Sequence, residues 1–102
     1  MSGLGTPIRA LLIEDNPGDA RLIREMLRDA AGGHAEVELA HADRLSTGLE
    51  RLSLRDVEIV LLDLSLPDST GFDTFTTVHT QAPEVAIVVL SGLDDETRRG
   101  RY

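Results

Sequence analysis

Four side chains that could bind a metal ion or a phosphoryl group directly follow apolar runs of the sequence. They are Glu14 and Asp15 after Ile8–Ile13, Asp63 after Val57–Leu62, and Ser91 after Val85–Leu90. Carboxylates crowded at one place repel one another, which raises their pKa values unless a cation is present. Mg²⁺ prefers oxygen ligands, so we expect Asp15 and Asp63 to bind this ion directly, with Glu14 acting through a water molecule.

Phosphoryl chemistry is the second possibility for the same residues. A carboxylate can attack phosphorus and form an aspartyl phosphate, and a bound Mg²⁺ would offset the charge of the transferred group. Asp63 would then be the acceptor, and the Ser91 hydroxyl would hydrogen-bond the phosphoryl group. Each residue alone has an ordinary explanation, because acids after strands are often solvated and Ser-Gly is a common turn. The convergence of three strand ends is what favours a site.

Other chemically capable residues give no comparable signal. His34, His41 and His79 are scattered without metal-ligand spacing, and we expect no role for them at the site. There is no Cys, which excludes disulfides and thiolate sites. Phe72 and Phe75 are expected in the core.

The elements that position these residues alternate along the chain. The three apolar runs are typical of strands buried on both faces, and residues 35–41 alternate as in an edge strand. Between them, helices are expected to start at Asn16-Pro17, at Asp43, at Gly71 and, after the last strand, at Asp94. Their expected inner faces are Ala20, Ile23, Met26, Leu27, Ala30 and Ala31 in the first, Leu45, Leu49 and Leu52 in the second, and Phe72, Phe75 and Val78 in the third.

A strand–helix repeat of this kind predicts an α/β fold, a doubly wound parallel sheet with helices on both faces. Ligands bind such sheets outside the carboxyl ends of the strands, near the point where the strand order reverses. If the first, third and fourth strands are neighbours, the four polar side chains converge there.

Length and charge bound the function further. The 102 residues suit one domain, 1–102, and the net charge of −8 argues against nucleic acid or an anionic membrane as a partner. We find neither a membrane-spanning run nor a signal peptide, and expect a soluble cytoplasmic protein.

Three stretches together resemble a known family. "LLIEDNPGDARLIREML", "VLLDLSLPDSTGFDTF" and "IVVLSGLDDET" are similar to the receiver domain of two-component response regulators, over about residues 7–97. The resemblance implies a flavodoxin-like sheet with strand order 2-1-3-4. It also implies a signalling switch that a histidine kinase or phosphotransfer protein phosphorylates in the presence of Mg²⁺.

The family's site residues can be transferred to the matching positions. The resemblance makes Asp63 the phosphoacceptor, Ser91 the switch hydroxyl, and Pro67 and Gly71 part of the loop that shapes the site. The metal ligands would be Glu14, Asp15, Asp63 and the backbone carbonyl of Ser65.

The sequence departs from the family pattern near its end. A receiver normally continues through a fourth helix, a fifth strand that ends in a Lys, and a fifth helix, whereas all ten basic residues here are Arg. We expect Val85–Leu90 to be an exposed edge strand, and the chain to form a homodimer through this edge or by element exchange.

Two alternatives remain open. Without the Lys and the C-terminal third, the chain could be a receiver-like interaction module that is not phosphorylated. A Mg²⁺-dependent phosphohydrolase would need a second acid near Asp63, and Asp68 is poorly placed for this role. We therefore expect no enzyme.

Overall fold

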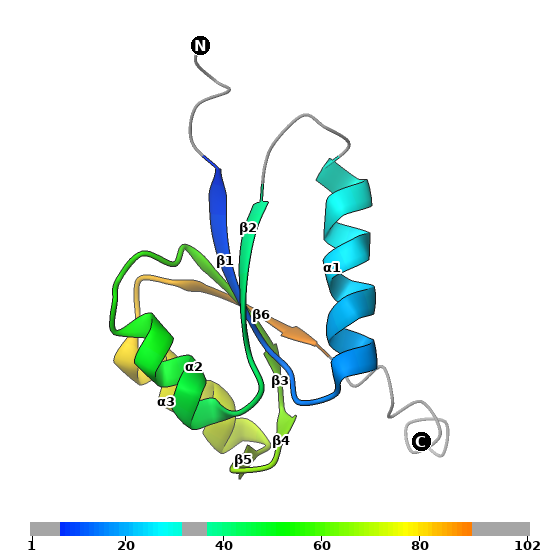
Figure 1. Ribbon diagram of the computed structural model, residues 1–102. Coiled ribbons are helices and arrows are strands. Elements are labelled where there is room, and N and C mark those ends of the chain that lie inside the picture. Colours follow the sequence, from blue (N-terminus) through cyan, green and yellow to red (C-terminus); the bar gives the residue numbers. More distant parts are fainter. Residues whose placement is uncertain (1–6, 32–36, 91–102) are drawn as a thin grey trace.

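The computed structural model describes residues 7–31 and 37–90, which form a parallel four-stranded sheet between helices (Figure 1). The strand order is β2-β1-β3-β6, which confirms the predicted order 2-1-3-4. The strands are β1 (Ile8–Ile13), β2 (Val37–Ala42), β3 (Ile59–Asp63) and β6 (Ala86–Leu90). Ser91 and the helix expected from Asp94 lie outside the described residues.

Helices cover both faces of the sheet, as the alternating pattern predicted. Helix α1 (Pro17–Ala31) packs on one face through Ala20 and Ile23, which contact Leu12 and Leu61. Helices α2 (Leu45–Leu52) and α3 (Phe72–Gln81) lie on the opposite face (Figure 1). Among the described residues, no helix combines the length and the apolar character needed to cross a membrane.

The first turn of α1 follows its sequence signals. The Asn16 side-chain oxygen accepts a hydrogen bond from the Asp19 backbone N–H at 3.0 Å, and Pro17 is the first helical residue. This bond satisfies one of the backbone donors that a helix start leaves without a partner. The predicted start at Asn16-Pro17 is confirmed.

Two residues expected on inner helix faces are exposed instead. Met26 is 56% exposed and Phe72 is 75% exposed. In α3, the fully buried residues are Thr74 and Val78, one turn apart, and this phase turns Phe72 toward solvent. Phe72 stacks on the partly buried Phe75 with ring centroids 5.8 Å apart.

A short hairpin follows β3 that the sequence pattern did not predict. Its strands are β4 (Ser65–Leu66) and β5 (Ser69–Thr70), which pair antiparallel. The next residue, Gly71, has φ +71°, a backbone conformation that glycine adopts without a steric penalty. Its N–H donates to the Leu64 carbonyl at 2.7 Å, so the turn closes immediately before α3.

The hairpin also caps α2. We expected this helix to open at Asp43, but it begins at Leu45, and the residue before it makes no side-chain cap. The Asp68 carboxylate instead accepts hydrogen bonds from the backbone N–H groups of Leu45 at 2.8 Å and Ser46 at 2.9 Å. A residue distant in the sequence thus satisfies donors that the local sequence leaves open.

Candidate functional site

Three acidic side chains meet at the carboxyl edge of the sheet. Strands β1 and β3 are adjacent and parallel, with Ile13 beside Leu62, so the residues that follow them come together. One carboxylate oxygen from each of Glu14, Asp15 and Asp63 lies within 4.8 Å of the others. The structure therefore brings together the three acids that the sequence singled out.

Two of these acids are buried. Glu14 is 4% exposed and Asp63, the last residue of β3, is 6% exposed, while Asp15 is exposed. Asp63 is therefore not an ordinary loop acid in solvent, which was the alternative interpretation of this residue. A buried carboxylate needs hydrogen-bond or charge partners, because removal from water disfavours its ionised form.

Asp63 and Glu14 each accept a hydrogen bond from a nearby backbone N–H group. The Ser65 N–H donates to Oδ1 of Asp63 at 2.9 Å, and the Asn16 N–H donates to Oε2 of Glu14 at 3.2 Å. Each donor lies two residues after the acid it serves, so the bend of the chain beyond each strand orients the carboxylate. Ser65 thus lies beside Asp63.

Electrostatics at the cluster favour a cation. Burial is the main cause that raises the pKa of Glu14, to about 8, and hydrogen bonding and charge repulsion from Asp63 raise it further. The negative charge of Asp19 adds to this effect, while the hydrogen bond from Asn16 opposes it. A cation would reverse this balance by favouring the ionised carboxylates. The donor set is all oxygen, which fits a hard divalent ion such as Mg²⁺.

A histidine that the sequence did not associate with the site contacts it. Nε2 of His41, on the neighbouring strand β2, lies 2.8 Å from the backbone carbonyl oxygen of Glu14. No spacing signal in the sequence indicates this contact, because it depends on the register in which β2 pairs with β1. His34 lies outside the described residues, and His79 stacks on Phe75 in α3.

Asp68 takes no part in the acidic cluster. Its carboxylate holds the start of α2, and two backbone N–H groups lower its pKa. The hairpin that carries Asp68 is also tied to α3, since the hydroxyls of Ser69 and Thr74 lie 2.7 Å apart. The segment after Asp63 therefore links the acidic cluster to two helices.

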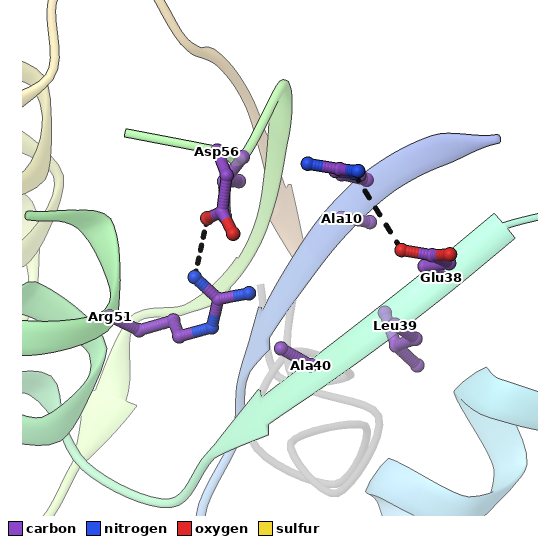
Figure 2. Close-up of a pocket in the computed structure, with 8 residues that line it drawn as sticks. Ala10, Glu38, Leu39, Ala40, Arg51 and Asp56 are labelled. Carbon is purple, nitrogen blue, oxygen red and sulfur yellow. Dashed lines mark hydrogen bonds and ion pairs between the residues drawn. The ribbon is translucent and has the colours of Figure 1, made fainter. Parts of the chain in front are cut away.

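A pocket at the amino end of the strands is separate from this cluster (Figure 2). Its charged residues pair with one another, Arg9 with Glu38 at 3.6 Å and Arg51 with Asp56. The Arg51 hydrogen bond lowers the pKa of Asp56. The first pair joins β1 to β2, and the second joins the end of α2 to the segment before β3, at the end of the sheet opposite the acids.

Known proteins share the sequence pattern and the fold of this chain. The sequence matches the family of the response regulator receiver domain over residues 10–102. The cell cycle response regulator CtrA of Brucella ovis is 33% identical over 86 residues, which cover 84% of this chain. The chain spans only about a third of that relative's length, 35%.

Solved structures support the fold. The signal receiver domain of an HD domain-containing protein from Pseudomonas fluorescens Pf-5 is similar with a TM-score of 0.75 and 19% identity, covering 99% of this chain and 71% of that chain. The non-phosphorylated HemR receiver domain from Leptospira biflexa has a TM-score of 0.63 and 27% identity, covering 94% and 73%. With its flavodoxin-like sheet and its family match over most of its length, this chain belongs to the response regulator receiver domain family.

Proposed function

We propose that this chain is a phosphorylation switch in which Asp63 accepts a phosphoryl group in the presence of Mg²⁺. The observation that carries this proposal is the cluster of Glu14, Asp15 and Asp63, whose carboxylate oxygens lie within 4.8 Å of one another. The donor would be a phosphohistidine on a histidine kinase or a phosphotransfer protein. Such a donor is charged from ATP, so we place the exchange in the cytoplasm.

The chain's own residues supply position and polarity. Asp63 lies at the end of a buried strand, and the Ser65 N–H holds one of its oxygens at 2.9 Å. In the transfer, an Asp63 oxygen forms a bond to phosphorus while the bond from phosphorus to the donor nitrogen breaks. Held by Glu14, Asp15, Asp63 and the Ser65 carbonyl, Mg²⁺ would supply the positive charge that this transfer needs.

Fixing the carboxylate in place favours such a reaction, because phosphoryl transfer depends mainly on positioning and electrostatic stabilisation. Ser91 would then hydrogen-bond the phosphoryl group and complete the switch. We propose that the chain accepts the group and does not turn over phosphoesters. The next acid in the sequence after Asp63 is Asp68, and its carboxylate is hydrogen-bonded to the start of α2, which supports this proposal.

The test is intact mass after incubation with Mg²⁺ and acetyl phosphate, with circular dichroism to verify folding. We expect the mass of one phosphoryl group on the wild type and on Asp73→Asn, an exposed acid at the start of α3, but none on Asp63→Asn. No addition to the folded wild type would contradict the proposal and favour a non-phosphorylated interaction module. Release of phosphate in many turnovers per chain would instead indicate an enzyme.

We also propose that the chain forms a homodimer through strand β6. Val88 and Val89 on this strand are each 42% exposed, and among the described residues β6 pairs only with β3. An apolar edge strand with free backbone groups is a surface on which a second strand can pair. Element exchange between two chains would cover the same surface.

A further inference from the structure

The backbone of Glu14 is held from strand β2 by two hydrogen bonds. The Glu14 N–H donates to the Ala42 carbonyl at 2.9 Å, which extends the β1–β2 ladder by one step. Strand β2 ends at Ala42, so it offers no further backbone partner in this ladder. The Glu14 carbonyl oxygen is hydrogen-bonded by a side chain instead. That partner is Nε2 of His41, at 2.8 Å.

The chemistry of this contact fixes its direction. A carbonyl oxygen can only accept, so Nε2 of His41 carries the proton and donates it. The Glu14 carbonyl and the Asp15 N–H belong to one planar peptide group. A hydrogen bond to one end of this plane therefore restricts the rotation of the other end.

The position of this peptide matters for the acidic cluster. Consecutive residues of a strand point to opposite faces of a sheet, yet carboxylate oxygens of Glu14 and Asp15 lie within 4.8 Å of each other. The chain must therefore leave strand geometry at the peptide between them, and a bend begins at Asp15. The His41 hydrogen bond holds the peptide at this bend.

The geometry points to His41 as a positioning residue of the metal site: it fixes the peptide that sets Asp15 beside Glu14 and Asp63. The inference rests on the proposed function, because it assumes that these acids bind Mg²⁺. His41 itself ligates nothing in this arrangement. It acts through the backbone, and residues outside the ligand set that orient the ligands commonly affect metal affinity.

The experiment is calorimetric titration of the whole chain with MgCl₂, with three substitutions. We expect His41→Ala to weaken Mg²⁺ binding about tenfold, the lower end of the loss typical for residues that orient metal ligands. In His41→Gln the amide NH₂ can replace Nε2–H as donor, and we expect binding within about threefold of wild type. His79→Ala removes an exposed histidine of α3 and should bind like wild type.

A metal-free readout separates positioning from general stability. In amide NMR spectra without Mg²⁺, His41→Ala should shift the Asp15 nitrogen resonance, and His41→Gln should return it toward the wild-type position. Equal Mg²⁺ affinity of wild type and His41→Ala would overturn the inference, as would His41→Gln binding as weakly as His41→Ala. A wild type that binds no Mg²⁺ would overturn the proposed metal site itself, and with it the inference.

Discussion

The buried carboxylate of Glu14 lies in an environment that disfavours its charge. Burial and the neighbouring Asp63 raise its pKa to about 8 from an ordinary value of 4.5. A site built for a cation has this property before the cation binds, since acids arranged as ligands repel one another. The metal-free protein should therefore be less stable than its packing alone would make it.

The pH dependence of stability tests this point. Between pH 4.5 and 8, folded Glu14 retains a proton that the unfolded chain has released, so the free energy of unfolding falls as pH rises through this interval. Glu14→Gln cannot ionise and should be more stable than wild type near the top of this interval, by about 2 kcal/mol. The difference should shrink toward the acid end.

Urea unfolding in the presence of EDTA, at several pH values in that interval, measures the difference. Glu50→Gln, a substitution of an exposed acid on α2, serves as the control and should show no such trend. A Glu14→Gln effect of constant size across the interval would contradict the pKa assignment.

The three acids were predictable from sequence because each follows directly after an apolar strand. Parallel pairing brings the carboxyl ends of neighbouring strands to one edge, and the strand order that the resemblance implied makes the strands before Glu14 and Asp63 neighbours. His41 was not predictable, because its contact depends on strand register. The prediction that Phe72 lies in the core was wrong, because α3 is oriented with Thr74 and Val78 toward the core.

At the scale of elements, the hairpin after β3 determines where α2 begins. Asp68 accepts hydrogen bonds from the first two backbone N–H groups of this helix, while Asp43 pairs with the adjacent Arg44 at 3.5 Å. Sequence signals for helix starts are local, and this cap comes from more than twenty residues away. The hairpin and the Asp68 cap of α2 were therefore not predicted. The start of α1 was predicted, because its cap lies next to it in the sequence.

We predict that Asp68→Ala lowers the urea midpoint of unfolding, because it leaves the N–H groups of Leu45 and Ser46 without their acceptor. These bonds lower the pKa of Asp68, so their stabilisation is present above the unfolded value of 3.8 and is lost as pH falls through the folded value. The gap between wild type and Asp68→Ala should therefore close in acid. Asp43→Ala is the control, and an equal loss there would contradict this assignment.

Helix α2 also packs closely against β1, through Gly48 and Ile13. A Cβ at Gly48 would lie 2.5 Å from Cδ1 of Ile13, a residue that is fully buried. Overpacking of a core costs about 1–3 kcal/mol, while Ala in place of Gly favours a helix by about 1 kcal/mol. We expect Gly48→Ala to reduce the free energy of unfolding by about 1 kcal/mol.

A double-mutant cycle identifies the cause. Ile13→Val removes the Cδ1 atom, so Gly48→Ala should cost less in that background than in wild type. Chemical unfolding of the four proteins gives the coupling free energy. Additive effects of the two substitutions would show that the loss at Gly48 has another origin.

At the scale of the whole molecule, the sheet has an asymmetric cover. Helix α1 packs on one face in a cluster with Leu12 of β1 and Leu61 of β3. Strand β6, at the far edge, carries Val88 and Val89, each 42% exposed (Figure 1). The alternation of strands and helices predicted a parallel sheet with helices on both faces, whereas the strand order was predicted from the resemblance to the receiver family. What covers this edge is not set by strand order, and it is here that we expect a second chain.

Sedimentation velocity over a range of concentrations tests the homodimer. We expect the wild type to sediment as a dimer and Val88→Lys to shift toward monomer, because a charge on an edge strand opposes pairing with a second strand. Leu54→Lys changes a residue that is 64% exposed outside the sheet, and it should leave the dimer intact. A wild type that remains monomeric at the highest concentration would contradict the proposed β6 homodimer.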